Sequence, residues 1–194
     1  VFREWAPNAK EIYLIGDFND WKEHGDYRMY HVKNSPGVWE VELQSGAIKH
    51  GDLYKLKVRW NGGEGERIPA WANRVVQDEQ TKIFSAQVWE PENPYRFRKK
   101  VFRAKTDPLM IYECHIGMAQ EEERVGTYNE FREKILPRIA EAGYNCIQIM
   151  AIQEHPYYGS FGYHVSSFFA PSSRFGTPDE LKELIDTAHR MGIA

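Results

Sequence analysis

The feature that most constrains the fold of this sequence is a change in the spacing of its apolar residues near residue 103. Before this point apolar residues recur at every second position, which is typical of antiparallel strands with one face in water. After it, short apolar runs alternate with segments in which apolar residues recur every three or four positions, which is typical of βα units. The chain of 194 residues is therefore predicted to hold a β domain over residues 1–103 and an α/β domain over residues 104–194.

The first domain is predicted to be a β-sandwich of the immunoglobulin type. Strands are expected at residues 11–17, 38–43, 54–60 and 83–89. Turns rich in glycine and asparagine separate them, including one at Asn61–Gly65, and no amphipathic helix of useful length interrupts them. Several short strands with such punctuation favour a sandwich. Residues 90–107 are rich in proline and basic residues, so they are expected to form a solvated linker or wrap between the domains.

The tryptophans of this domain divide into two predicted roles. Trp21 ends the motif GDFNDW just after a turn, where its ring can be exposed and can stack on the C–H faces of sugars. The alternative for Trp21 is that it packs on its own domain. Trp5 and Trp39 have apolar neighbours at strand spacing and are predicted to lie in the core. Lys55 lies on the polar face of its strand, and taken alone it is expected to be solvated.

The second domain is predicted to consist of buried parallel strands, each followed by a capped helix. The strands are expected at Met110–Ile116 and Cys146–Ile152, because both are near-continuous apolar runs. Two capping boxes, Thr127–Glu130 and Thr177–Glu180, mark the starts of the helices. Ile193 is expected to open a third strand. The chain is therefore predicted to contain the first, incomplete part of an α/β barrel from a larger protein.

The first of these helices is predicted to bury one stripe of apolar residues. The stripe has spacings of four, four and three and consists of Phe131, Ile135, Ile139 and Ala142. Pro137 lies inside the helix and is expected to kink it or to split its hydrogen bonding.

A long aromatic loop, His155–Thr177, follows the second strand. Loops after the strands of an α/β barrel form its active-site mouth, so this loop is predicted to be one wall of a binding cleft. Glu113 and Glu154 could be taken for a catalytic pair, but they are expected to hold strand ends or loops by hydrogen bonds. His115 and His155 lack a spacing typical of metal ligands.

Charge and composition exclude several classes of protein. A net charge of −3 argues against nucleic acid or an anionic membrane as the main partner. No apolar run approaches the 18 residues or so of a membrane span. Aromatic residues make up 14% of the chain, with six tryptophans. They could either fill the hydrophobic core or provide flat surfaces on which ligands stack. Cys114 and Cys146 fall in predicted buried strands and are expected to be inert thiols, which favours an intracellular compartment.

Several motifs, in order along the chain, resemble those of glucan-branching enzymes in the α-amylase superfamily. They are WAPNAKEIYLIGDFNDW, GVWEVEL and YKLKV in the first half, and IYECHIG, LPRIAEAGYNCIQIMAIQEH and YYGSFGYHVSSFFAPSSRFGTPDELKELIDTAHRMGI in the second. The resemblance is nearest to the eukaryotic type of 1,4-α-glucan branching enzyme and covers essentially the whole chain. It implies a carbohydrate-binding module followed by the first part of a (β/α)8 TIM barrel. The implied activity cleaves α-1,4 links and transfers the chain to a 6-hydroxyl group, which makes α-1,6 branches in glycogen or starch.

The resemblance implies substrate-binding roles for five residues. Tyr163 matches a tyrosine that forms a stacking floor under the sugar next to the cleaved bond. Arg174 and Thr177 are implied to line or prop the same side. Trp21 matches the glucan-stacking tryptophan of the module, and Lys55 matches a lysine that contacts sugar in related modules.

The resemblance does not assign a second stacking tryptophan or any catalytic residue. Related modules often have a second stacking tryptophan, and Trp60 and Trp71 bracket its place without matching cleanly. The catalytic carboxylates are implied to lie on later strands, so no catalytic residue is assigned and the chain alone is expected to be inactive. No cofactor or metal is implied. The expected partner is an α-glucan (glycogen, starch or amylose), in the cytoplasm or, for a plant protein, the plastid.

Two other functions stay open from the sequence. One is a debranching or trehalose-releasing hydrolase of the same superfamily. The other is a non-catalytic glycogen-binding adaptor, against which the capped helices and buried strands after residue 108 speak.

Overall fold

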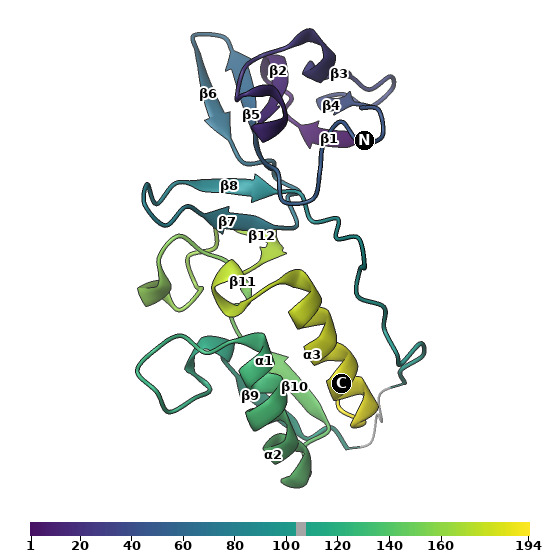
Figure 1. Cartoon of the computed structure of the whole chain (residues 1–194), viewed down its shortest axis with the longest axis vertical. Coiled ribbons are helices and arrows are strands. Elements are labelled where there is room, and N and C mark those ends of the chain that lie inside the picture. The colour runs from purple at the N-terminus through teal and green to yellow at the C-terminus, as the bar shows by residue number, and fades with distance from the viewer. Residues whose placement is uncertain (104–107) are drawn as a thin grey trace. The chain divides into compact units, whose positions relative to one another are not determined.

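The computed structural model describes residues 1–103 and 108–194, and the chain separates into two compact units. The first comprises Val1–Pro91 and Ser167–Ala170, and the second comprises Glu92–Ser166 and Pro171–Ala194 (Figure 1). Residues 104–107, which hold the end of the predicted linker and the start of the predicted second domain, lie outside the described residues. The boundary expected at residues 103 and 104 therefore stays a prediction.

Two antiparallel sheets make up the first unit (Figure 1). The smaller has the order β1-β4-β3, from β1 (Phe2–Trp5), β4 (Val38–Val41) and β3 (Tyr30–His31). The larger has the order β2-β5-β8-β7, with β6 also on β5, from β2 (Ala9–Gly16), β5 (Leu53–Trp60), β6 (Gly63–Arg67), β7 (Val75–Gln77) and β8 (Phe84–Gln87). Ile12, Leu56 and Trp39, from both sheets, enter one apolar core. The two sheets and their shared core agree with the predicted sandwich, and Trp39 is buried as predicted.

The prediction that Trp5 lies in the core is wrong, because its side chain is 57% exposed. Successive side chains of a strand point to opposite faces, and in β1 the inward position belongs to the fully buried Glu4. The carboxylate of Glu4 accepts hydrogen bonds from the amide nitrogens of Ala70 (2.8 Å) and Trp5 (2.9 Å), and it lies 3.1 Å from the guanidinium of Arg67. These partners compensate the burial of the charge, so Trp5 faces outward.

The turn predicted at Asn61–Gly65 is shorter than expected. It is confined to Asn61 and Gly62, after which Gly63 opens strand β6. Glycine weakens a strand because it offers no side chain to pack. The ring of Trp60 supplies that packing: a Cβ atom at Gly63 would lie only 3.1 Å from it, and one at Gly65 only 3.3 Å.

The second unit contains two parallel strands, β9 (Ile111–Cys114) near the centre of its predicted segment and β10 (Cys146–Ile149) in the first half of its segment. Apart from Cys114, their residues are partly buried or exposed, so the prediction of buried strands is wrong here. The helices are α1 (Tyr128–Glu130), η4 (Phe131–Ile135), α2 (Leu136–Glu141) and α3 (Pro178–Arg190), with the short strand β11 (Gln153–Glu154). Strand β12 (Ser167–Pro171) falls almost entirely in the first unit. Short 3-10 turns are η1 (Asp17–Asn19) and η2 (Gly25–Tyr27) in the first unit, and η3 (Ile116–Met118), η5 (Tyr158–Ser160) and η6 (Ser173–Phe175) in the second. Ile193 is buried, and Ala194 donates to the carbonyl of Asn145 and accepts from the amide of Ile147. The end of the chain thus runs parallel to β10 at its edge.

Pro137 splits the first helix, as predicted. The segment η4 before it is a π-helix, in which the amide of Leu136 donates to the carbonyl of Phe131, five residues earlier. This wider turn changes the buried stripe. Leu136, which is not in the predicted stripe, is fully buried, and Ile135 is partly buried and packs against the core. Ala142 is exposed, so its prediction as a stripe member is wrong. Both predicted capping boxes are present, at Thr127–Glu130 and Thr177–Glu180.

The predicted linker is held against helix α3 within the second unit. The fully buried carboxylate of Asp186 accepts hydrogen bonds from the Tyr95 hydroxyl (2.7 Å) and from the backbone amides of Arg98 (2.9 Å) and Lys99 (2.8 Å). One turn further along the helix, the ring of Phe102 stacks on that of His189, with centroids 4.1 Å apart. We refer to residues 95–102 as the strap. Its basic side chains are exposed, as expected.

The remaining predictions on cysteines and membranes can be compared directly with the structure. Cys114 is buried, and burial, followed by the charge of Glu113, raises the pKa of its thiol to about 12, so it is an inert thiol. Cys146 is only half-buried, at the start of β10. Within residues 1–103 and 108–194, no helix has the length and apolar character needed to cross a membrane.

Candidate functional site

Trp21 lies at the end of a short, strongly constrained turn of the first unit. After β2, the turn η1 carries the chain to Asp20 and Trp21, which both have positive φ angles (53° and 58°). The amide of Trp21 donates to the carbonyl of Gly16 (2.9 Å), and the indole Nε1 donates to Oδ1 of Asp17 (2.9 Å). The Trp21 side chain is 37% exposed. The turn therefore presents part of the ring to solvent while its only polar atom is already satisfied.

Lys55 lies beside this ring. Its Nζ atom is 5.8 Å from the centre of the Trp21 ring, within the range of a cation–π interaction. The same ammonium group is 3.7 Å from the carboxylate of Glu66 on β6. Lys55 is therefore not simply solvated as expected, because its ammonium group lies between an aromatic ring and a carboxylate.

Neither candidate for a second stacking tryptophan shares this surface. Trp60 has the strand parity of the core-facing residues of β5, opposite to that of Lys55, and its ring covers Gly63 and Gly65. It borders a hollow of about 410 Å³ that also includes Trp5. Trp71 borders a different hollow of about 510 Å³. We refer to the exposed face of Trp21 together with the adjacent Lys55 ammonium group as the Trp21 surface.

The aromatic loop of the second unit closes on Glu154, which is fully buried. One carboxylate oxygen accepts from the amide of Ser173 (2.7 Å), and the other accepts from the amide of His155 (3.1 Å) and the hydroxyl of Ser172 (3.3 Å). Both ends of the loop therefore meet at one side chain. The prediction that Glu154 holds a loop by hydrogen bonds is confirmed. Glu113 similarly accepts from the side-chain amide of Gln148 (2.8 Å).

Tyr163 is 68% exposed, and its backbone is fixed from two sides. The carbonyl of Phe161 lies 2.9 Å from Nε2 of His115. Gly162, with φ of 84°, approaches the backbone so closely that a Cβ atom would lie 2.3 Å from the carbonyl oxygen of Ala151. A glycine is required there. The Tyr163 hydroxyl reaches Sδ of Met150 at 3.5 Å, so one ring edge is held while the ring itself stays open.

Arg174 and Thr177 support the loop in this structure. The guanidinium of Arg174 donates to the carbonyl of Pro156 (2.9 Å), which ties the end of the loop to its beginning. The hydroxyl of Thr177 accepts from the amide of Glu180 and thereby caps helix α3. The predicted propping role fits these contacts, whereas direct contact of either side chain with a substrate stays a prediction.

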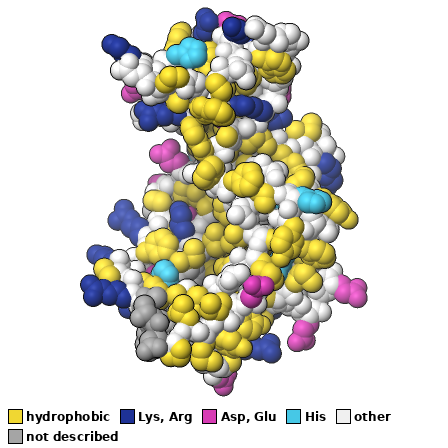
Figure 2. Space-filling view, turned by 180° about the vertical axis from the view of Figure 1, so that it is seen from behind, with side chains coloured by type: hydrophobic (Ala, Val, Ile, Leu, Met, Phe, Trp, Pro, Cys, Tyr) yellow, Lys and Arg dark blue, Asp and Glu magenta, His cyan; other side chains and the backbone are white. Residues whose placement is uncertain are grey.

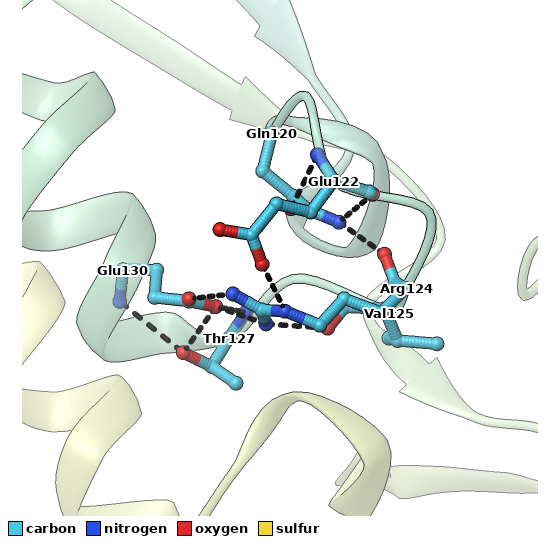
Figure 3. A network of polar contacts seen from close by, with 6 residues as sticks. All are labelled: Gln120, Glu122, Arg124, Val125, Thr127 and Glu130. Atoms are coloured by element: carbon cyan, nitrogen blue, oxygen red, sulfur yellow. Dashed lines mark hydrogen bonds and ion pairs between the residues drawn. The ribbon is translucent and has the colours of Figure 1, made fainter.

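The loop after β9 is held by a separate charged network around Arg124 (Figure 3). Its guanidinium bonds both oxygens of Glu130 and also Glu122, at 2.6 Å. Glu130 closes the capping box with Thr127. Hydrogen bonds from Arg124 lower the pKa of Glu130 to about 2, more than burial raises it. This loop is thus locked onto the start of its helix.

Two further observations bear on ligands. The face displayed in Figure 2 carries many hydrophobic side chains, interspersed with charged ones. Within the residues that the structure describes, no group of three or more His, Cys, Asp or Glu side chains could hold a metal ion.

The sequence analysis did not identify Asp17 and His115 as residues that support the exposed aromatic side chains of Trp21 and Tyr163. Asp17 lies inside the GDFNDW motif, whereas nothing in the sequence pairs His115 with Phe161.

Comparison with known proteins places the first part of the chain in a class. Residues 1–72 match the family model of carbohydrate-binding module 48, the isoamylase N-terminal domain. Residues 1–72 are therefore similar in sequence to this class of carbohydrate-binding module.

Along its whole length the chain is similar in sequence to 1,4-alpha-glucan-branching enzymes. It is 46% identical to that of Saccharomyces cerevisiae and 45% identical to that of Dictyostelium discoideum, over 100% and 99% of this chain and 29% of each relative. It is 47% identical to 1,4-alpha-glucan-branching enzyme 2-2, chloroplastic/amyloplastic, of Arabidopsis thaliana, over 100% of this chain and 24% of that protein. The predicted resemblance is confirmed, and the chain spans less than a third of the length of these relatives.

Solved structures share the fold at low sequence identity. The catalytic module of the glycogen-degrading pneumococcal virulence factor SpuA matches with a TM-score of 0.77 and 18% identity, over 99% of this chain and 34% of that chain. The pullulanase SAP of Group B Streptococcus matches with a TM-score of 0.73 and 20% identity, over 99% and 31%. These matches concern the fold alone.

Proposed function

We propose that this chain is the glucan-binding module and the first barrel segment of a 1,4-α-glucan branching enzyme. The complete enzyme would cleave an α-1,4 link and transfer the chain to a 6-hydroxyl group of glycogen or starch. Residues 1–103 would form an immunoglobulin-like module with its linker, and residues 104–194 the beginning of a (β/α)8 barrel. The partner would be an α-glucan, in the cytoplasm or, as the name of the Arabidopsis relative suggests for that protein, in a plastid.

The observation that carries the binding role is the Trp21 surface. A partly exposed indole, fixed by Asp17 and flanked by the Lys55 ammonium, combines a flat apolar face with a hydrogen-bond donor at its side. Sugar rings offer the complementary pattern of C–H faces and hydroxyl edges. A barrel is favoured by the second unit, in which β9, β10 and Ala194 follow one another in parallel register and in sequence order.

The proposed chemistry is retaining transfer with two carboxyl groups, a nucleophile and an acid/base. The resemblance carries neither onto a residue of this sequence, and Glu113 and Glu154 are occupied by the hydrogen bonds described above. Tyr163 would supply the stacking floor beside the cleaved bond. The 194-residue chain is therefore expected to bind glucan without branching it, and branching by this chain alone would contradict the assignment.

The binding role can be tested with the 194-residue chain itself. Titration with maltoheptaose, followed by calorimetry, should give an affinity that Trp21→Ala lowers by about tenfold or more, because a central stacking tryptophan dominates such a surface. Tyr30→Ala removes an aromatic side chain that is 62% exposed in the same unit and should leave the affinity unchanged. Equal affinity of the Trp21→Ala variant and the parent chain would refute the Trp21 surface as the binding site.

The catalytic role needs the complete protein. Tyr163→Ala in that protein should reduce turnover strongly and leave the thermal midpoint nearly unchanged, because the side chain is mostly exposed. Tyr157→Ala is the matched control, since Tyr157 lies in the same loop and is 69% exposed. Turnover that falls equally in both variants would argue against a specific stacking floor at Tyr163.

The two alternative functions give different readouts in the same system. A branching enzyme shifts the iodine stain of amylose without a proportional release of reducing sugar. A debranching or trehalose-releasing hydrolase releases sugar, and a glycogen-binding adaptor changes neither.

A further inference from the structure

The carboxylate of Asp17 is shared between the Trp21 ring and strand β5. Its Oδ1 atom accepts from the indole Nε1 at 2.9 Å, and its Oδ2 atom accepts from the backbone amide of Leu53 at 2.8 Å. The indole has no other polar atom. A single side chain therefore determines both how the ring is turned and where it stands relative to β5.

The same strand carries Lys55, two residues after Leu53. Its ammonium lies 5.8 Å from the centre of the Trp21 ring. Because Leu53 and Lys55 are only two residues apart on β5, the bond from Asp17 to the Leu53 amide holds the ring close to the lysine. The two groups of the candidate sugar surface are thus coupled through one carboxylate.

The backbone of the turn is strained in a way that requires such support. Asp20 and Trp21 both adopt left-handed conformations that non-glycine residues rarely take. The side chain of Asn19 bridges the amide of Gly16 (2.9 Å) and the carbonyl of Leu14 (3.0 Å). Strained backbone of this kind persists where surrounding bonds over-determine it, and it concentrates at binding sites.

We propose that Asp17 is a positioning residue for glucan binding, which holds the Trp21 ring in its stacking orientation without touching the sugar. This inference rests on the proposed binding role of Trp21. Ordering a free side chain on binding reduces affinity. A ring already fixed by Asp17 avoids that loss, so removal of the carboxylate should weaken binding by about two- to tenfold.

The test is a double-mutant cycle on the 194-residue chain. Maltoheptaose affinity is measured for the parent chain, Asp17→Ala, Trp21→Ala and the double variant. Asp17→Ala should weaken binding in the parent background and have no further effect in the Trp21→Ala background. In parallel, the indole N–H signal of Trp21 is followed by NMR, and its exchange with solvent should become faster in Asp17→Ala.

Two further variants separate positioning from charge and from misfolding. Asp17→Asn keeps one acceptor and should give an intermediate affinity. Asp20→Asn removes the same charge from the same turn and should match the parent chain. If Asp17→Ala fails to fold, as seen from its NMR spectrum, the cycle is run with Asp17→Asn under the same criteria.

The outcomes distinguish this inference from the proposed function. An unchanged indole exchange rate, or an equal loss of affinity with and without Trp21, overturns the positioning role of Asp17. If Trp21→Ala alone leaves the affinity unchanged, the Trp21 surface itself fails, and with it the inference. If Trp21→Ala weakens binding and Asp17→Ala does not, only the inference fails.

Discussion

Two irregular segments of this protein are each held by one aspartate, but the two anchors differ in their origin. In the first unit, Asp17 belongs to the same short turn as Trp21, whose indole it binds. In the second unit, the strap is bound by Asp186, which lies in helix α3 about ninety residues further along the chain. Asp17 is exposed, whereas Asp186 is fully buried.

The two aspartates therefore have different roles: Asp17 orients one side chain, whereas Asp186 fixes the path of a backbone segment. Asp17 competes with water for its donors, so it contributes mainly to the direction of a ring. Asp186 receives two backbone amides and a hydroxyl away from water, where an unpaired donor is costly. The distant anchor should therefore matter more for stability, and the local one more for binding.

The largest effect is expected from Asp186→Asn. The new side-chain amide places an N–H group where the carboxylate accepted hydrogen bonds, so the strap should open far more often. Trypsin cleavage between residues 96 and 100 should become roughly tenfold faster or more, as followed by mass spectrometry.

The control for this variant is Glu183→Gln, which removes a charge from the same helix at a residue paired with Arg132. Its cleavage rate should equal that of the parent chain. Equal rates for Asp186→Asn and Glu183→Gln would show that the strap does not depend on Asp186.

Acid should reproduce part of this effect. Burial raises the pKa of the Asp186 carboxyl, but hydrogen bonds from Lys99, Arg98 and Tyr95 lower it by more, from 3.8 to about 2 overall. A lowered folded-state pKa contributes stability above the unfolded-state value, and this stability is lost as the pH falls through about 4 towards 2. The urea midpoint of the parent chain should fall over this range.

The comparison with Asp186→Asn isolates this carboxyl, because Glu130 also has a pKa near 2 and titrates in the same range. The difference in urea midpoint between parent and variant should shrink as the pH falls from about 4 to about 2. A constant difference would contradict the assignment of the acid effect to Asp186.

The smallest effect is expected at another local anchor, the N-cap of helix α3. Thr177→Ala removes the hydroxyl that accepts from the amide of Glu180 and should lower the free energy of unfolding by about 1 kcal/mol. Thr177→Ser keeps the hydroxyl and should be nearly neutral. Thermal unfolding of both variants measures the difference, and equal losses would point to the methyl group instead of the cap.

Local anchors are also the part of the structure that the sequence predicts well. Both capping boxes and the exposure of Trp21 follow from residues close together in the chain. Trp5 was predicted wrongly because the inward position of β1 is set by Glu4, whose partners Arg67 and Ala70 come from a distant segment. Apolar character alone does not reveal such a buried carboxylate.

The candidate site likewise has one part that can be predicted from contiguous residues and one part that depends on tertiary packing. The Trp21 motif is contiguous, so its presence and its partner Asp17 can both be found in the sequence. The support of Tyr163 depends on His115 and Ala151, which reach the loop only through the packing of separate elements. The strap could be predicted as a connecting segment, but its docking on Asp186 is a tertiary interaction with no local signal.

The π-helical turn before Pro137 has a consequence for how relatives of this chain are aligned. A turn closed between Phe131 and Leu136 contains one residue more than an α-helical turn. In evolutionary terms it is equivalent to a one-residue insertion that the helix absorbs without changing its ends. Relatives that lack the π turn should therefore align with a single gap within residues 131–136, and an ungapped alignment would pair Ile135 with the wrong face of their helix.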